Sequence, residues 1–126
     1  MRLWVTFFAL LSSTALAVRP PEDSTSLERE QRSLLDQWYE ELGAPGPDES
    51  FGNFLVRAAV LKWHSPYAHR KETYGPERLR VDLSRFDCVT LIDTSMAVAR
   101  CAWLGDATET CFIKELVASR YRNGTM

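Results

Sequence analysis

The sequence predicts a small, predominantly α-helical domain, and three observations favour this fold class. Apolar residues recur at helical spacing in four separate stretches of the chain. Capping residues or glycines mark the ends of these stretches. Only one short segment, residues 78–83, alternates polar and apolar side chains as a half-buried strand does. The length of 126 residues allows one small domain with a modest core.

The start of the chain has the parts of a secretory signal peptide. Arg2 supplies a positive charge, residues 3–11 are apolar but too short to span a bilayer comfortably, and Ala15 and Ala17 are the small residues that signal peptidase reads. We therefore expect residues 1–17 to be removed after Ala17. An uncleaved anchor is the alternative.

Cleavage implies a protein exported to the periplasm or the extracellular space, with no stable membrane anchor afterwards. Residues 18–24, which contain two prolines, are expected to form a flexible lead before a domain over residues 25–126. The formal net charge is −2 and charges of both signs are interspersed, which argues against nucleic acid as a partner.

Two helices are predicted in the first half of the domain, over residues 27–42 and about 50–63. The first starts in a capping-box pattern, residues 25–28, and ends before Gly43. The second follows a proline-bearing loop over residues 44–48. The side chains expected on their apolar faces are Leu27, Leu34, Leu35, Trp38 and Leu42, and then Phe51, Leu55, Ala58, Ala59 and Trp63.

The helical period is lost over residues 64–85. Ser65, Pro66 and Tyr67 predict a turn with an extended continuation, because the residue before a proline is displaced from the helical region. The strand candidate over residues 78–83 lies within this stretch.

Two further helices are predicted after this stretch. One runs from Cys88 or Val89 to Trp103 and stops at Gly105. The other follows a second capping-box pattern with Asp106 in the cap and continues until the glycine at position 124. Its apolar face carries Phe112, Leu116 and Tyr121.

The chain contains three cysteines, an odd number for an exported protein. Cys101 and Cys111 are the natural pair, because they would lie on either side of the short turn between the last two predicted helices. The open alternative is that both are small apolar core residues, as free cysteine often is. A disulfide between them would leave Cys88 free.

Cys88 is the most informative residue because it stands where a helix is predicted to begin. The first N–H groups of a helix have no partner within it and carry part of the positive macrodipole. Such a position stabilises a thiolate, the form that attacks a carbonyl. Cys88 is therefore a candidate nucleophile, and Asp87 beside it is expected to accept backbone hydrogen bonds at the helix start.

Three spaced patterns together resemble the NlpC-type papain-like cell-wall cysteine peptidases, in their N-acetylmuramoyl-L-alanine amidase-like branch. The first is the predicted helix that leads into the turn at residues 65–67. The second is the apolar lead-in at residues 79–83 followed by Phe86-Asp87-Cys88-Val89-Thr90. The third is Arg120-Tyr121-Arg122-Asn123-Gly124, which resembles the turn that ends a helix of the family. They cover residues 50–124 in the order of the family.

The resemblance implies an α+β fold of the papain-like type, of which this chain would cover mainly the helical N-terminal half without the C-terminal sheet. It implies that Cys88 is the nucleophile, that Tyr67 lines the substrate groove and that Asp87 is a structural residue beside the nucleophile. The implied reaction is hydrolysis of amide bonds in peptidoglycan stem peptides, with no cofactor and no metal.

Departures from the family pattern limit what the resemblance implies for activity. Residues 91–93 and 64–65 differ from the usual family residues. The larger departure is that the catalytic histidine of the family follows the Arg-Tyr-Arg-Asn-Gly turn, whereas this chain stops at that turn. Because a thiol nucleophile needs a base, we expect this chain alone to have no appreciable hydrolase activity.

Several single residues allow a second interpretation. His64 or His69 could act as the base, although a solvated turn is the ordinary setting for both. Their spacing to Cys88 matches no compact zinc pattern. Trp38, Trp63 and Trp103 are expected to pack in the core rather than to stack on carbohydrate. The rival functional hypothesis is a small secreted helical protein that binds cell-wall peptide or a partner without catalysis.

Overall fold

The computed structural model describes residues 26–69 and 78–121, and these form four helices. They are α1 (Arg29–Leu42), α2 (Phe51–Val60), α3 (Cys88–Trp103) and α4 (Glu109–Arg120). Within these described ranges there is no strand, and the one sheet-like pairing is a parallel bridge between Tyr67 and Phe86. The predominantly α prediction is thus confirmed, whereas the α+β sheet is not formed by this part of the chain. No helix here is long and apolar enough to cross a membrane.

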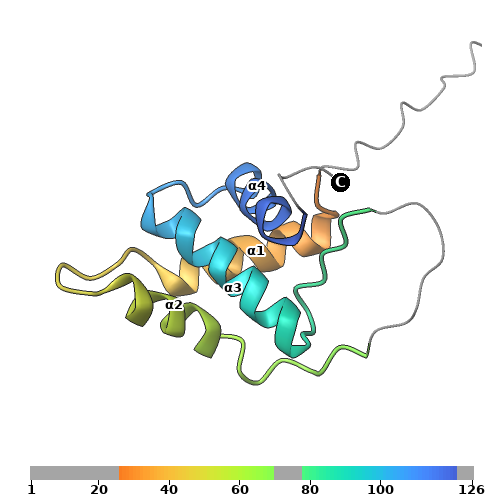
Figure 1. Ribbon diagram of the computed structural model, residues 1–126, viewed down its shortest axis with the longest axis horizontal. Helices are drawn as coiled ribbons and strands as arrows, with labels where there is room; N and C mark the ends of the chain where they lie inside the picture. The colour runs from red at the N-terminus through yellow and green to blue at the C-terminus, as the bar shows by residue number, and fades with distance from the viewer. Residues whose placement is uncertain (1–25, 70–77, 122–126) are drawn as a thin grey trace, which may run out of the picture.

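Helix α3 is the central element of the fold (Figure 1). It packs against α4 on one side and α2 on the other, and α1 lies behind it. The side chains that fill the space between the helices are fully or almost fully buried and come from all four. They include Leu35, Trp38, Phe54, Val98, Phe112 and Leu116.

Helix α1 begins two residues later than predicted, because no side chain caps it at Glu28. Part of the predicted capping box, Thr25, lies outside the described residues. The N–H of Leu27 instead donates to the Glu109 carboxylate at 2.6 Å, so the start of α1 is held by α4. The end is as predicted: Gly43 has a φ of 63° and its N–H donates to the Tyr39 carbonyl at 3.0 Å. The predicted apolar face is also confirmed, since it contributes to the core.

Helix α2 ends at Val60, earlier than predicted. The chain tightens there into shorter turns, in which the Lys62 N–H donates to the Ala59 carbonyl and the Trp63 N–H to the Val60 carbonyl. Trp63 lies in these turns rather than on α2, and it is 74% exposed. The prediction that Trp63 packs in the core is therefore wrong. The buried face of α2 centres on Phe54 and Ala58.

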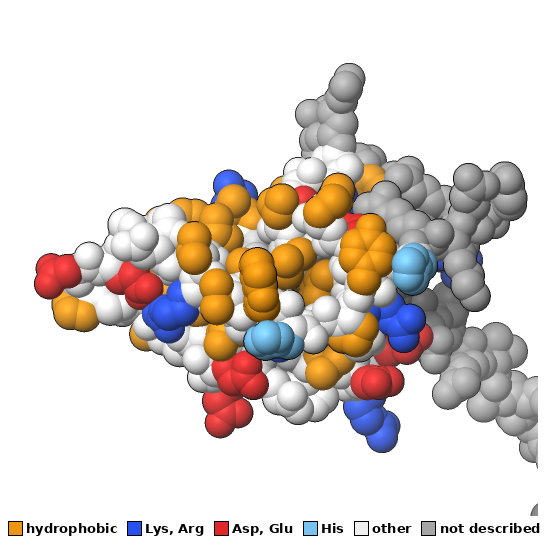
Figure 2. Space-filling model, turned by 90° about the horizontal axis from the view of Figure 1, so that it is seen from below, with side chains coloured by type: hydrophobic (Ala, Val, Ile, Leu, Met, Phe, Trp, Pro, Cys, Tyr) orange, Lys and Arg blue, Asp and Glu red, His pale blue; other side chains and the backbone are white. Residues whose placement is uncertain are grey.

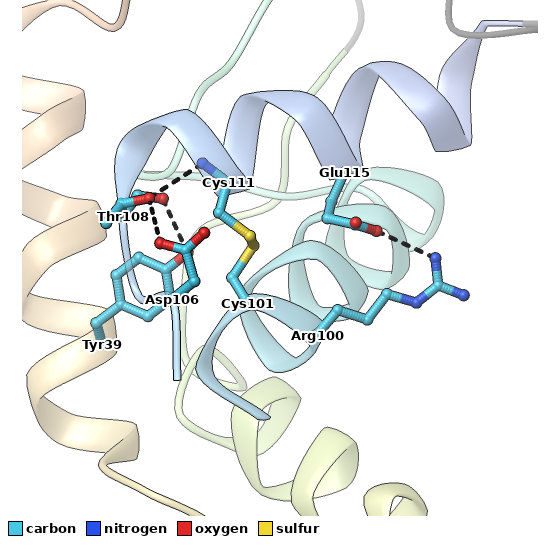
Figure 3. Close-up of a disulfide and its surroundings, with 7 residues drawn as sticks. All are labelled: Tyr39, Arg100, Cys101, Asp106, Thr108, Cys111 and Glu115. Carbon is cyan, nitrogen blue, oxygen red and sulfur yellow. Dashed lines mark hydrogen bonds and ion pairs between the residues drawn. A yellow bond between two sulfur atoms is a disulfide. The ribbon is translucent and has the colours of Figure 1, made fainter. Parts of the chain in front are cut away.

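Helix α3 spans the predicted residues, and Gly105, with a φ of 74°, follows it in the turn to α4. Helix α4 starts later than predicted because its cap is Thr108, not Asp106. The Thr108 hydroxyl oxygen accepts a hydrogen bond from the Cys111 N–H at 3.1 Å. The same hydroxyl donates a hydrogen bond to the Asp106 carboxylate at 2.9 Å (Figure 3). Helix α4 ends at Arg120, and the predicted end at position 124 lies outside the described residues.

A disulfide joins Cys101 near the end of α3 to Cys111 in the first turn of α4 (Figure 3). The two Cα atoms lie 5.9 Å apart, and both residues are buried. The structure thus decides between the two alternatives in favour of the bridge. It leaves Cys88 as a free, exposed thiol.

The segment over residues 78–87 forms no strand over residues 78–83, so that prediction is wrong. Its alternating pattern has a different cause: Leu79, Val81 and Leu83 pack against the helical core. The Leu83 N–H donates to the Gln31 side chain of α1 at 2.6 Å. A helix surface, rather than a neighbouring strand, therefore covers the apolar side of this segment.

Candidate functional site

The start of α3 holds Cys88 in a defined position. The Asp87 carboxylate accepts the Thr90 N–H at 2.7 Å, and the Asp87 N–H donates to the Thr90 hydroxyl oxygen at 2.9 Å. This reciprocal capping box makes Cys88 the first residue of the helix. Asp87 is buried whereas Cys88 is exposed, so the thiol lies at the surface on a rigid support.

Tyr67 lies beside the residues that precede Cys88. The Phe86 N–H donates to the Pro66 carbonyl at 3.0 Å, and the Ala68 N–H donates to the Phe86 carbonyl at 2.9 Å. Phe86 is buried, and its ring contacts Trp38 edge-on at 5.8 Å between ring centroids. The Tyr67 side chain is 64% exposed. The structure therefore brings Tyr67, Asp87 and Cys88 together, while their functional roles remain predictions.

The two histidines lie on the same segment as Tyr67. The His69 ring contacts the Tyr67 ring edge-on, at 5.2 Å between centroids, and both histidines are exposed. Among the residues that the structure describes, neither histidine is hydrogen-bonded to the Cys88 thiol. His69 therefore contacts a predicted groove residue.

Arg120 connects the end of α4 to this region. Its guanidinium donates to the Asp93 carboxylate of α3 at 3.4 Å and to the Arg80 carbonyl at 2.8 Å. The segment that leads into Cys88 is thereby attached to two helices. Arg120, the first residue of the Arg-Tyr-Arg-Asn-Gly pattern, thus contacts one residue that precedes Cys88 in the sequence and one that follows it.

Trp63 is an exposed aromatic residue that the sequence pattern did not reveal. Figure 2 shows the face formed by α2, the following segment and the start of α3, where hydrophobic side chains gather around a shallow hollow. The exposed apolar residues of these elements are Val56, Val60, Leu61, Trp63, Tyr67, Val89 and Ile92. The sequence predicted that α2 continues to about residue 63, and a helix of that length would have directed Trp63 inward. The structure ends α2 at Val60.

The other two predicted core tryptophans differ from Trp63. Trp38 is fully buried and its indole N–H donates to the Ala58 carbonyl at 3.0 Å, which confirms the prediction. Trp103 contacts the Phe51 and Phe54 rings edge-on, although 37% of the residue stays exposed. No group of three or more His, Cys, Asp or Glu side chains placed to hold a metal ion is found in the described ranges.

Comparison with known proteins gives one match. A protein-family model described as N-acetylmuramoyl-L-alanine amidase-like matches residues 64–126, which is half of the chain. The matched part contains Tyr67, Asp87 and Cys88, and it leaves out α1 and α2. Neither the curated proteins nor the solved structures that were compared include a match.

Proposed function

The chain belongs to the N-acetylmuramoyl-L-alanine amidase-like family, and on that premise we propose that it carries the nucleophile-bearing part of an amide hydrolase for peptidoglycan. The observation that carries this proposal is the position of Cys88. It is an exposed free thiol at the first residue of α3, beside a segment pinned to Tyr67, within the matched part of the chain.

The reaction that this position supports is thiolate attack on an amide carbonyl. The Cys88 sulfur forms a bond to the carbonyl carbon, and the electron pair of the C=O bond moves to its oxygen. The N–H of Cys88 is available to stabilise that oxyanion, because the first N–H groups of a helix lack intrahelical partners. Collapse of this intermediate releases the amine, which takes a proton, and water then hydrolyses the thioester.

We further propose that this chain alone has no appreciable hydrolase activity. Thiol proton removal and leaving-group protonation both need a base, which in the papain-like enzymes that the sequence resembles is a histidine. The position of His69 supports this part of the proposal, because its ring contacts Tyr67 edge-on and it makes no hydrogen bond to the Cys88 thiol.

Export to an oxidising compartment also belongs to the proposal. The Cys101–Cys111 disulfide supports it, since such bridges persist in the periplasm and outside the cell and are rare in the cytosol. A peptidoglycan stem peptide is the proposed partner. The predicted signal peptide over residues 1–17 lies outside the described residues.

Alkylation of Cys88 tests the proposed site directly, because the disulfide leaves it as the free thiol of the three cysteines. We expect purified muropeptides to slow the reaction of Cys88 with iodoacetamide in the folded chain and to have no effect on the chain unfolded in urea. No protection in the folded chain would contradict a peptidoglycan site at Cys88.

Turnover is measured on the same muropeptides. We expect no release of peptide above that of the Cys88→Ala variant. Release that is abolished by Cys88→Ala would contradict the proposed inactivity and would assign the base to another group of this chain. Protection without turnover is the outcome expected from the proposal as a whole.

A further inference from the structure

We propose that the exposed apolar surface around the start of α3 docks a second copy of this chain, so that a dimer covers the Cys88 thiol. We call this surface the Cys88 face. Its apolar residues, each at least half exposed, are Val56, Val60, Trp63, Tyr67, Val89 and Ile92. The dimer itself stands independently of the proposed function. Its consequence, that a peptidoglycan ligand reaches Cys88 in the monomer alone, rests on that function.

The elements that carry the Cys88 face are joined to one another. Helix α2 packs against α3, and the bridge between Tyr67 and Phe86 attaches the segment after α2 to the residues that precede Cys88. Cys88 is exposed, and Ile92, four residues later on α3, lies on the same side of the helix. Figure 2 shows hydrophobic side chains of these elements gathered on one side of the molecule around a shallow hollow.

The area of the Cys88 face is close to what a dimer contact needs. A fully exposed residue of these types presents about 150–250 Å², so the observed exposed fractions amount to on the order of 700 Å². The largest apolar patch of a typical monomer is about 300–600 Å². Each partner of a standard protein interface buries about 800 Å². The face therefore suffices for a dimer with a dissociation constant in the micromolar range.

The charges of these elements favour an identical partner. In a two-fold dimer the same patch lies on both sides, so an unbalanced charge would meet its own sign. Arg57 pairs with Glu49 at 2.8 Å, and the Lys62 ammonium lies over a buried indole ring of α1. The Asp93 carboxylate of α3 accepts a hydrogen bond from Arg120 at 3.4 Å. An anionic lipid surface is attracted by free cations, whereas an apolar face with balanced charges fits its own copy.

Dimer formation at this face would regulate access to Cys88. The thiol lies in the first turn of α3, next to Val89 and on the same side as Ile92, so a partner docked there buries it. A ligand that needs the exposed thiol then binds the monomer and shifts the equilibrium toward it.

Sedimentation of the full chain carrying Cys88→Ala tests the dimer, because this variant cannot form a disulfide between two copies. We expect the weight-average mass to rise from that of one chain toward that of two between about 1 and 100 µM. Ile92→Glu brings two like charges together in the dimer and should weaken association about tenfold or more. Val60→Glu, on α2, should have the same effect.

Leu104→Glu is the matched control for the added charge. Leu104 is 72% exposed but follows the other end of α3, outside the Cys88 face. The same change there should leave association unchanged. Circular dichroism checks that every variant keeps its helices.

Alkylation of Cys88 in the parent chain measures whether the dimer covers the thiol. We expect its rate constant with iodoacetamide to fall several-fold as the protein concentration rises through the same range, because only the monomer exposes the thiol. In the Ile92→Glu variant the rate constant should be independent of protein concentration.

The possible outcomes separate the dimer from the proposed function. A chain that stays monomeric throughout overturns the dimer, and if it co-sediments with phosphatidylglycerol vesicles the face belongs to a lipid surface. Association that Leu104→Glu weakens as much as Ile92→Glu places the contact elsewhere. Association with an unchanged alkylation rate shows that the dimer leaves Cys88 open. Protection of Cys88 by muropeptides is measured on the dilute chain, so none of these results decides the proposed function.

Discussion

Asp87 determines, at the scale of a single residue, where α3 begins. Its carboxylate and its N–H exchange hydrogen bonds with Thr90, three residues along the chain. The same geometry makes the next residue, Cys88, the first of the helix, with its thiol at the surface. A pattern of only four residues therefore positions the candidate nucleophile, because capping is a local interaction.

Gly43 is required by its backbone conformation. Its φ of 63° and ψ of −163° lie in a region that is essentially restricted to glycine. An added Cβ would meet no atom within 4 Å, so the cost of Gly43→Ala is conformational and not steric. We expect this variant to lose about 1–3 kcal/mol of unfolding free energy in urea denaturation.

Gly52→Ala is the matched control because Gly52 is helical and has an open side. The nearest atom to an added Cβ is the Ser50 hydroxyl oxygen at 4.0 Å. This variant should gain about 0.5 kcal/mol, because alanine loses less backbone entropy than glycine in a helix. Equal unfolding midpoints for the two variants would contradict the assignment of strain to Gly43.

At the scale of elements, α3 and α4 form a helical hairpin. A disulfide and the packing of the two helices hold it together. The Cys101–Cys111 bridge spans the turn at Gly105, and Arg100 pairs with Glu115 one turn farther along (Figure 3). This ion pair is half-exposed on the arginine side, so it contributes little. The bridge and the buried apolar side chains carry the stability of the hairpin.

Loss of the bridge should be costly for so small a domain. With a sequence separation of 10, the chain-entropy relation gives about 3 kcal/mol. We expect the variant carrying Cys101→Ala and Cys111→Ala to unfold at correspondingly lower urea concentration, and to be insensitive to dithiothreitol. The Cys88→Ala variant is the control and should keep the full response to the reductant. An unchanged midpoint in the double variant would show that packing alone holds the hairpin.

At the scale of the whole molecule, Glu109 joins the two ends of the helical domain. It lies at the first position of α4 and accepts hydrogen bonds from the Leu27 N–H and the Arg32 guanidinium of α1, 82 and 77 residues away in the sequence. Burial opposes ionisation of this carboxyl group, but the hydrogen bonds from Arg32 and Leu27 outweigh burial. The pKa of Glu109 is consequently lowered from its usual value of 4.5.

This lowered pKa predicts an acid-dependent loss of stability. A carboxyl group with a depressed folded-state pKa stabilises the protein above pH 4.5, and that contribution is lost as the pH falls through the folded-state value. We expect Glu109→Gln to be less stable than the parent chain at pH 7 and the difference to shrink at pH 3. Glu41→Gln, at an exposed position of α1, serves as the control. A difference that is the same at both pH values would contradict the role assigned to the Glu109 charge.

Much of the fold could be predicted from local signals. The four helices, the glycine at the end of α1 and the helix start at Cys88 follow from apolar period and capping chemistry, which act over a few residues. The Cys101–Cys111 pair was predictable as a possibility, because a helix–turn–helix brings such positions near each other. The alternatives stayed open because pairing depends on the distance between two packed helices.

The remaining features were decided by tertiary contacts. The start of α1 depends on Glu109, a residue far along the chain, so no capping pattern near Thr25 could show it. The alternating segment over residues 78–83 needed a partner, and a helix surface took that place. Trp63 was assigned to the core because a helix of its predicted length would have pointed it inward.

The sequence by itself determined the helical class, the position of Cys88 at a helix start and the resemblance to cell-wall amide hydrolases. These depend on spacing and on residue type, which are properties of the chain alone. Only the tertiary structure decided that Tyr67 lies beside the residues preceding Cys88, and that Trp63 is exposed. The physical reason is that both facts depend on hydrogen bonds and packing between segments distant in sequence, which local patterns do not specify.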